Sequence, residues 1–355
     1  MIFDFIMSRF GISNRKDFGR IFFVISKIFP IDRPDLALKR SRNILFSFFG
    51  WRFGFKGDIR PSILQLETVS GCNFNCIMCR AGDLKKEFMN YEDFKKIFDR
   101  FPEVFVVIMN LSGEPFLSKY TIDMIRYASF EAKAIVNIFS NFSILPHPEE
   151  VINSGLYEIH ASIDTFNESK FSRIREGGKL ERVLSNLENL VMFKKKNGKL
   201  LPIISINAVL SEETIEDAED IILNAIRIGV DRVKFQRLLF DLPDLHVPSE
   251  SSQKYMLLLK EKYKERICVV LNNFENVGEK AKGYCYLAYF MSAVKVNGDI
   301  YPCCMPYPFF YPQESIMGNV FHDFAKYYLK RKRFVGNFRK SPPKFCKQCP
   351  IYFRV

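Results

Sequence analysis

Apolar and polar positions alternate along most of the chain from about residue 61 onward. Apolar runs of strand length, rich in β-branched residues, recur at 63–69, 104–110, 134–140, 157–163, 202–210 and 231–240. Helical patterns separate these runs, and in them apolar residues recur every third or fourth position, as in 91–101 and 211–229. Strand and helix alternate six times in this region, which predicts parallel βα units.

The number of these units decides the fold class. Six βα units are fewer than a closed TIM barrel contains, so we expect an α/β fold built as a partial (β/α)6 TIM-like barrel. In such sheets the working residues gather at the carboxyl ends of the strands. We therefore expect the chemistry of this chain in the loops that follow the strands.

The flanking segments differ from this core in composition. The opening segment is rich in Phe and basic residues, and its helical stretches suit either a membrane interface or the apolar end of a barrel. Near the other end, Asn297-Gly298 between two alternating runs predicts a β-hairpin. We predict four regions: an N-terminal extension of amphipathic helices (1–60), a barrel core (61–242), a linker with one helix and one strand (243–283) and a small cysteine-rich C-terminal domain (284–355).

The charge of the chain lies at its ends. The formal net charge is +12, of which residues 1–60 contribute +7 and residues 326–355 contribute +10, so the intervening residues carry −5. Basic ends of this kind suit nucleic acid, anionic lipid or an acidic partner, and they also suit solvated surfaces. Charge alone does not choose among these partners.

Targeting signals and cysteine content bear on the compartment. No apolar run approaches the length of a membrane-spanning helix. Asp4 interrupts the first apolar stretch, and no small-residue cleavage site follows it. We therefore expect a cytoplasmic protein, with peripheral contact at the inner membrane surface if residues 1–60 bind lipid. Nine cysteines in that compartment favour metal or redox chemistry over disulfides.

Three cysteines are crowded into the loop after the first expected strand. Cys72, Cys76 and Cys79 lie within eight residues. Zinc sites usually combine two separated cysteine pairs, whereas an iron–sulfur cube held by three thiolates leaves one iron open to a further ligand. The triplet therefore favours a [4Fe–4S] cluster that binds a small molecule, with a structural zinc as the alternative.

The triplet and the ends of the next strands resemble one enzyme family. A C-x-x-x-C-x-x-C triplet after the first strand of a partial barrel is similar to that of the radical S-adenosylmethionine (SAM) enzymes. LSGEP at 111–115 ends the second strand where that family has a Gly-Gly-Glu-Pro turn that binds the SAM amino group. FSN at 139–141 and ASID at 161–164 end the third and fourth strands. The resemblance covers residues 61 to about 240.

The resemblance implies cofactor contacts and a reaction. The SAM-binding residues that it implies are Met78, Ser112, Gly113, Glu114, Ser140, Asn141, Ser162, Arg175 and Asn207. Ser112 replaces the first glycine of the family's turn, and Met78 stands where the family usually has an aromatic residue against the adenine. The resemblance further implies reductive cleavage of SAM to a 5′-deoxyadenosyl radical that abstracts a substrate hydrogen, with an electron donor such as ferredoxin or flavodoxin.

A second group of cysteines lies in the C-terminal region. Cys285, Cys303, Cys346 and Cys349 can form a four-thiolate site for zinc or for an iron–sulfur cube. This arrangement resembles the SPASM/Twitch extension of radical SAM proteins, and the shorter, single-cluster Twitch form fits the cysteine count better. The resemblance implies a second, auxiliary [4Fe–4S] cluster that accepts an electron, which favours a net oxidation of the substrate.

The sequence says least about the substrate. We expect an oxidoreductase, possessing dehydrogenase-like chemistry, that acts on a sugar-like, glycan or lipid-linked small molecule. Polar residues at strand ends are candidates for substrate contact: His160, Asp164, Gln236 and Arg237. Asp164 is also the candidate base that removes a hydroxyl proton. A peptide-modifying maturase is the alternative within the family, and a zinc-stabilised nucleic-acid-binding protein is the alternative from another class.

Overall fold

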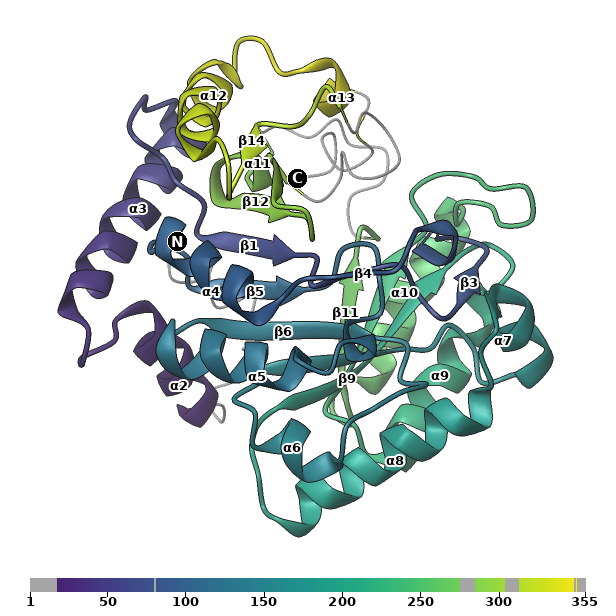
Figure 1. The fold of residues 1–355 in the computed structure, drawn as a ribbon. Coiled ribbons are helices and arrows are strands. Elements are labelled where there is room, and N and C mark those ends of the chain that lie inside the picture. Colours follow the sequence, from purple (N-terminus) through teal and green to yellow (C-terminus); the bar gives the residue numbers. More distant parts are fainter. Residues whose placement is uncertain (1–17, 80, 275–284, 304–312, 348, 350–355) are drawn as a thin grey trace.

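The fold is centred on one large sheet (Figure 1), seen in a computed structural model that describes residues 18–79, 81–274, 285–303, 313–347 and 349. In the order in which they pair, its strands are β11 (Cys268–Asn272), β10 (Arg232–Arg237), β9 (Ile203–Leu210), β7 (Glu158–Ser162), β6 (Ile135–Ser140), β5 (Val106–Met109), β1 (Ile63–Leu66), β12 (Met291–Val294), β13 (Asp299–Tyr301) and β14 (Gly318–Asn319). Neighbouring strands from β11 to β12 are parallel, and β13 and β14 are antiparallel additions at one edge.

The helices that connect the parallel strands cover one face of this sheet. They are α4 (Tyr91–Arg100), α5 (Thr121–Arg126), α6 (Pro148–Ile152), α7 (Glu168–Ile174), α8 (Leu180–Lys196), α9 (Ala218–Ile228) and α10 (Glu250–Tyr263). From β1 to β11 the chain always adds the next strand on the same side. Right-handed crossovers then place every connecting helix on the same face, as Figure 1 shows. The expected partial barrel of βα units is confirmed.

Local signals explain where several helices begin and end. The Asn90 side chain accepts a hydrogen bond from the Asp93 amide at 2.8 Å and caps α4. Gly229 ends α9 in the left-handed region, with a φ of +83°. The helix expected at 211–229 begins only at Ala218, because the Ser211 amide donates to the Thr214 hydroxyl at 3.0 Å and fixes a turn there.

The two faces of the sheet differ in burial. On the helix face, residues such as Val107, Ile138 and Ile206 are fully buried in the main core. Alternate residues point the other way, and we call their surface the inner face. Partly exposed members of the inner face are Gln65, Ile108, Asn137, Phe139, Ser162, Val209, Lys234, Gln236, Val270 and Asn272. Among the described residues, β11 and β14 are the two edges of this sheet, so its hydrogen-bonded strands do not close into a ring.

Two N-terminal helices close the amino end of the sheet. Helices α2 (Phe18–Ile28) and α3 (Pro34–Phe53) lie along the left edge in Figure 1, on the side where the strands begin. Val24 and Ile44 from these helices pack with Val106, Ile135 and Ile203, which begin β5, β6 and β9. The helices therefore cover the apolar end of the barrel, as one of the two alternatives predicts. Residues 1–17 of the predicted extension lie outside the described residues.

The C-terminal region continues the same sheet. Strand β12 pairs in parallel with β1, and the hairpin expected at Asn297-Gly298 joins β12 to β13, with Gly298 at a φ of +87°. Helices α11 (Leu287–Phe290), α12 (Phe324–Asn337) and α13 (Lys344–Lys347) surround it. The buried Arg331 of α12 donates to the carbonyl oxygens of Ile59, Tyr289 and Met291.

The exact division into four regions stays a prediction. Within the described residues, every helix is too short or too polar to cross a membrane.

Candidate active site at the carboxyl ends of the strands

The loop that carries the first cysteines packs tightly against residues 112–115, which we call the SGEP turn. After β2 (Val69–Ser70), Gly71 has a φ of +83°, and its amide donates to the Ser112 carbonyl oxygen at 3.0 Å. A Cβ atom on Gly113 would lie 2.2 Å from the Val69 carbonyl oxygen. Only glycine permits this approach, so the turn and the cysteine loop form one unit.

The remaining two cysteines are held by a short ladder and a tight turn. Cys76 lies in β3 (Asn75–Cys76), which pairs antiparallel with β8 (Arg175–Glu176). The Cys79 amide donates to the Cys76 carbonyl oxygen at 2.9 Å. Met78, the residue expected against the adenine, lies in this turn and is partly exposed.

The three thiols are close enough to influence one another. Burial raises the pKa of Cys76 to about 12, the nearby Arg175 opposes this, and Cys79 and Cys72 raise it further. Burial also raises the pKa of Cys72. Within the described part of the chain, no three His, Cys, Asp or Glu side chains are close enough to share a single metal ion. Three thiols that approach one another in one loop are the donor set that a [4Fe–4S] cluster with one open iron needs.

Glu114 of the same turn fixes the end of β6. Its carboxylate is 2% exposed and accepts hydrogen bonds from the Ser140 hydroxyl at 2.9 Å and the Asn141 amide at 2.7 Å, besides the Phe116 amide at 3.1 Å. Burial raises the pKa of Glu114 to about 7, although these hydrogen bonds favour the charged form. Three predicted residues, Glu114, Ser140 and Asn141, are thus brought together.

A small amide network surrounds Cys72. The Asn141 Nδ2 donates to the Cys72 Sγ at 3.6 Å and to the Asn73 Oδ1 at 2.9 Å. The Ser143 hydroxyl and amide both donate to the Asn141 Oδ1. Sequence reasoning missed Asn73, which directly follows Cys72, and Ser143, which lies two residues after Asn141.

Asp164 and Arg175 form a buried ion pair beside Cys76. The Arg175 Nε lies 2.7 Å from the Asp164 Oδ2, and the Asp164 Oδ1 accepts from the Val209 amide at 2.7 Å. The Arg175 guanidinium also donates to the Cys76 Sγ at 4.0 Å. Burial opposes the charge of Arg175, but Asp164 and Cys76 outweigh it and raise the pKa of this arginine. The pair therefore places a permanent positive charge next to a thiol of the triplet.

Polar side chains continue from this site down the inner face. Ser162 and Asn207 are register partners on β7 and β9, and the Gln236 Nε2 donates to the Asn207 Oδ1 at 3.3 Å. Amide groups also occur at Gln65 and Asn137. Arg237, the other candidate on β10, instead donates to the Pro248 carbonyl oxygen.

His160, one of the predicted candidates for substrate contact, lies deeper on the inner face in a charged cluster whose other members the sequence did not indicate. The Glu158 Oε2 lies 2.9 Å from the Lys234 Nζ and 3.7 Å from the His160 Nε2. Burial lowers the pKa of His160 to about 3, so its ring is neutral, and it stacks on Phe139 with 4.0 Å between ring centroids. Burial opposes the charge of Glu158, but His160, Lys234 and Arg232 lower its pKa to about 2. The only signal in the sequence is that Glu158 and His160 alternate on one strand.

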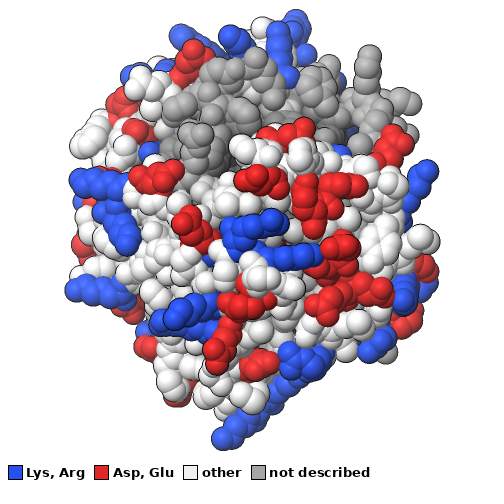
Figure 2. All heavy atoms as spheres, turned by 90° about the vertical axis from the view of Figure 1, so that its right-hand side faces the viewer, with Lys and Arg blue, Asp and Glu red and all other residues white. Residues whose placement is uncertain are grey.

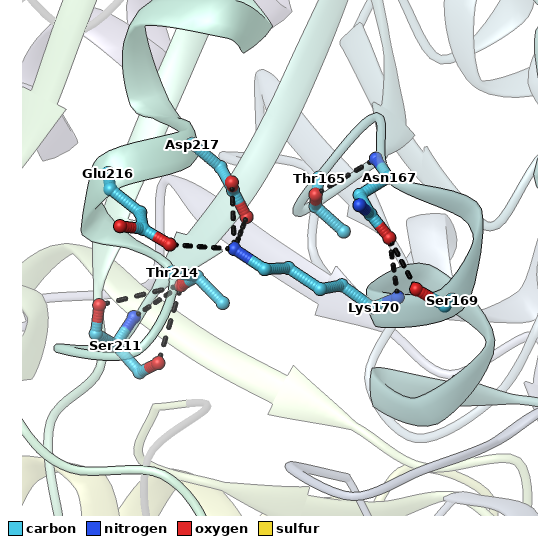
Figure 3. Close-up of polar contacts among 8 residues, drawn as sticks. All are labelled: Thr165, Asn167, Ser169, Lys170, Ser211, Thr214, Glu216 and Asp217. Atoms are coloured by element: carbon cyan, nitrogen blue, oxygen red, sulfur yellow. Dashed lines mark hydrogen bonds and ion pairs between the residues drawn. The ribbon is translucent and has the colours of Figure 1, made fainter.

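At the rim of the site, charged side chains from α7 and from the loop after β9 form ion pairs with each other. Lys170, near the start of α7, lies 2.9 Å from a Glu216 oxygen and 3.0 Å from an Asp217 oxygen in the loop after β9 (Figure 3). Figure 2 shows this side of the molecule, and over its described surface Lys and Arg are interspersed with Asp and Glu. Neither sign of charge dominates this face.

The second group of cysteines comes from three separate segments. Burial raises the pKa of Cys346, and the neighbouring Cys285 and Cys349 raise it further, so these three thiols are near one another. The Cys349 amide donates to the Cys346 carbonyl oxygen at 3.1 Å, which repeats the turn between Cys76 and Cys79. Cys303 follows β13 and is partly exposed. This donor set of thiols fits an iron–sulfur cluster as the first group does.

Two family models match the chain in the regions of the two cysteine groups. The model of the radical SAM superfamily matches residues 66–231. A second model, the SPASM iron–sulfur cluster-binding domain, matches residues 285–350. The two matches cover the first triplet and the second cysteine group, respectively.

Curated relatives are named as cyclases. The GTP 3′,8-cyclase of Saccharophagus degradans is 25% identical over 47% of this chain and 51% of its own length. The GTP 3′,8-cyclase of Thermodesulfovibrio yellowstonii is 24% identical over 58% of this chain and 62% of its own length. The chain thus spans about half to three fifths of the length of these relatives.

Solved structures share the fold at low sequence identity. Streptococcus suis SuiB bound to S-adenosylmethionine has a TM-score of 0.64 and 16% identity, and the match covers 82% of this chain and 72% of SuiB. The enzyme anSMEcpe with bound AdoMet has a TM-score of 0.58 and 16% identity, over 82% of this chain and 88% of that one. At such identities the likeness establishes the fold.

Proposed function

This chain belongs to the radical SAM superfamily and carries a C-terminal SPASM domain, and on that premise we propose that it oxidises a polar, uncharged small molecule. Its cofactors are [4Fe–4S] clusters and SAM. We propose three things beyond this: the residues that hold the cofactors, the class of the substrate, and oxidation as the type of reaction.

The first cysteine triplet holds the SAM-binding cluster in this proposal. Cys72, Cys76 and Cys79 supply its thiolates, and the turn at Gly113 and Glu114 positions SAM beside them. When bound, the cluster and SAM supply abstraction of a hydrogen atom from the substrate. The locked contact between Gly71 and Ser112 supports this assignment because it fixes the turn relative to Cys72.

The second cysteine group holds an auxiliary cluster in this proposal. Cys285, Cys303, Cys346 and Cys349 supply four thiolates, which leaves no iron open for a substrate. Electron transfer is the role that remains for such a cluster, and a partner that accepts an electron favours oxidation over rearrangement. The reductant of the first cluster is a low-potential carrier of the ferredoxin or flavodoxin kind.

The balance of charges on the inner face carries the substrate proposal. Lys234 is paired with Glu158, and Arg175 with Asp164. The partly exposed polar residues around them are mainly amides and hydroxyls: Gln65, Asn137, Ser162, Gln236 and Asn272. Phosphate and carboxylate groups bind best to available cations, whereas hydroxyl groups are well matched by amides, which donate and accept. A neutral, sugar-like molecule therefore suits this surface better than a nucleoside triphosphate.

Two other substrate classes compare less well with the same surface. The curated relatives are named for GTP, and on the described inner face a triphosphate would compete with the acidic partners of Lys234 and Arg175. SuiB has been solved with a precursor peptide, and a peptide-modifying activity stays the alternative because peptide groups are neutral and polar. The mixed charges on the face in Figure 2 do not favour nucleic acid.

Helix α3 supports a peripheral contact with an anionic membrane. Leu38, Leu45, Phe49 and Phe53 lie on one side of it and are 44–73% exposed, and Lys39, Arg42 and Arg52 are exposed as well. No acidic residue occurs from 36 to 57. Exposed aromatic and basic residues on one helix suit a lipid interface. This surface covers the amino end of the sheet, so the contact would anchor the enzyme with its active site facing away from the lipid.

Vesicle binding tests the membrane contact. Wild-type protein should sediment with vesicles that contain phosphatidylglycerol and not with pure phosphatidylcholine. The double change Phe49→Glu and Phe53→Glu should abolish this, whereas Leu258→Glu, at an exposed site on α10, should not. Sedimentation that survives the double change would contradict the contact.

Iron and sulfide analysis tests the proposed clusters. Protein reconstituted without air should hold about eight irons, and changing Cys72, Cys76 and Cys79 to Ala should leave about four. The matched control is Cys268→Ala, which removes a thiol of neither group and should change nothing. If wild-type protein holds only about four irons and the triple variant holds none, the proposed auxiliary cluster is contradicted. Stoichiometric zinc without iron would overturn both assignments.

Stimulated SAM cleavage tests the substrate class. Reduced enzyme should cleave SAM faster with a neutral polyol or glycoside than with GTP at the same concentration. Stimulation by GTP alone would contradict the proposed class, and stimulation by peptides alone would establish the alternative.

A further inference from the structure

One buried carboxylate lies between the two cysteine regions. Glu67 directly follows β1, and its side chain is fully buried. Its Oε1 accepts a hydrogen bond from the Ser112 hydroxyl, and its Oε2 accepts one from the Val296 amide at 3.0 Å. The Glu67 amide itself donates to the Val294 carbonyl oxygen at 2.9 Å. Glu67 is therefore bonded to the SGEP turn and to the C-terminal hairpin at once.

On one side, this contact reaches the first cysteine loop. Ser112 binds Glu67 through its hydroxyl, and its carbonyl oxygen accepts from the amide of Gly71, the residue before Cys72. Ser112 is also the position at which this chain departs from the family's turn. A glycine there would have no hydroxyl to offer Glu67.

On the other side, the contact reaches the second group. Val296 begins the turn of the hairpin, and β13 then leads toward Cys303. Asn319 secures the hairpin, because its Nδ2 donates to the Asn297 carbonyl oxygen at 3.0 Å and to the Asp299 Oδ1 at 3.1 Å. The hairpin is thus a defined element with one side-chain link to the SGEP turn through Glu67.

We propose that Glu67 is a positioning residue that couples the SAM-binding turn to the hairpin of the auxiliary-cluster region. The inference rests on the proposed function for the roles of the two cysteine groups. A carboxylate can accept at both oxygens, whereas the amide of a glutamine accepts at only one. A carboxylate also makes charge-assisted hydrogen bonds, which are stronger than those of a neutral amide, so the two-sided contact is strongest with Glu. A shift of the hairpin is then transmitted to Ser112 and from there to the loop of Cys72.

The first experiment compares Glu67→Gln with Glu103→Gln in cluster-loaded protein. Glu103 is a second buried carboxylate, 4% exposed, and lies 3.5 Å from Arg60, away from the cysteine loop. Hydrogen exchange of the Val296 amide should become about tenfold faster in Glu67→Gln, as expected when a hydrogen bond to a carboxylate is replaced by a weaker one to a neutral amide. The dissociation constant of SAM should rise about tenfold in the same variant. Glu103→Gln should change neither quantity, even if it lowers the melting temperature.

A double-mutant cycle separates coupling from simple loss of stability. Asn319→Ala loosens the hairpin without touching a cysteine, and it should weaken SAM binding in the wild-type background by about threefold or more. In the Glu67→Gln background the same change should have a clearly smaller effect, because the link is already weakened. Ser112→Gly should reproduce the effect of Glu67→Gln on SAM binding.

The outcomes distinguish this inference from the proposed function. If wild-type protein holds only about four irons, the auxiliary cluster fails, but the exchange of Val296 and the cycle still decide the coupling. If both clusters form and the effects of Glu67→Gln and Asn319→Ala on SAM binding are additive, the coupling is overturned. Unchanged exchange at Val296 in Glu67→Gln would overturn it as well.

Discussion

The two ends of the sheet hold their buried charges in different ways. At the amino end, Arg40 is 1% exposed and donates to the carbonyl oxygens of Lys27, Val104, Ala132 and Lys133 at 2.5–3.0 Å. On the inner face and at its carboxyl end, several buried charges instead meet charged side chains, as in the pairs of Glu158 with Lys234 and Asp164 with Arg175. Backbone partners cannot leave without local unfolding, whereas side-chain partners can rearrange around a ligand. The difference indicates that one end is built for stability and the other for chemistry.

Removing Arg40 should give the largest loss of stability and so tests the amino end. Arg40→Met leaves four buried carbonyl oxygens without a donor, which we expect to cost about 3 kcal/mol or more in the free energy of unfolding. Urea unfolding of cluster-loaded protein measures it. Arg42→Met, at an exposed site on the same helix, should cost less than about 0.5 kcal/mol. Equal effects of the two changes would remove the contrast between the ends.

Gly113→Ala should act at the carboxyl end with little effect on folding elsewhere. The added Cβ would lie 2.2 Å from the Val69 carbonyl oxygen, so the SGEP turn must move away from the cysteine loop. A displacement of about 1 Å in a reacting group can cost about a hundredfold in rate, and we expect SAM cleavage to fall at least that far. The matched change is Gly336→Ala in α12, where a Cβ meets no atom within 4 Å. It should leave cleavage unchanged.

The sequence predicts the carboxyl end better than the amino end, for a physical reason. Residues 72–79, Ser112 and Asn141 could be identified because chemistry restricts their types and spacing. Arg40 could not, because its partners are carbonyl oxygens of segments up to 93 residues away, which any residue type can supply. The sequence did not identify Glu67 and Glu158 as functional residues, for a similar reason. Each is an acid in an apolar strand, and only the folded register shows what it binds.

The expected sheet was incomplete in one respect for the same reason. The six alternating runs predicted the βα units, but not that β11 and β12 would join their sheet at opposite edges. Strand pairing is decided by neighbours that are distant in sequence: Ile63 pairs with Met291. Local periodicity carries no information about such partners.

Asp164→Asn sharpens the contrast within the carboxyl end, because it separates chemistry from positioning. If Asp164 is the base for a substrate hydroxyl, as we propose, product should fall by about a hundredfold while SAM cleavage continues. Asparagine still accepts from the Val209 amide, so the backbone contact survives. Product and SAM cleavage are measured together, with the substrate that stimulates the wild-type enzyme. A parallel fall in SAM cleavage would show that Asp164 instead positions Arg175 beside Cys76.

A change at His160 should have the smallest effect, and it tests whether burial in the charged cluster of the inner face keeps this ring neutral. Burial lowers its pKa from 6.5 to about 3, so the folded protein keeps the ring neutral where the unfolded chain binds a proton. The stability that His160 contributes is present above pH 6.5 and is lost as the pH falls toward 3. Between about pH 7.5 and 5.5 this amounts to about 1.4 kcal/mol.

His160→Gln should remove that part of the pH dependence. The variant will be less stable throughout, because the stack on Phe139 is weakened, but its free energy of unfolding should fall by about 1.4 kcal/mol less than that of wild type over the same interval. Urea unfolding at both pH values measures the difference, and comparing each protein with itself cancels the lost packing. An unchanged pH dependence would mean that the ring takes up its proton in the folded state. The inner face would then accept added positive charge, and the argument for an uncharged substrate would lose its support.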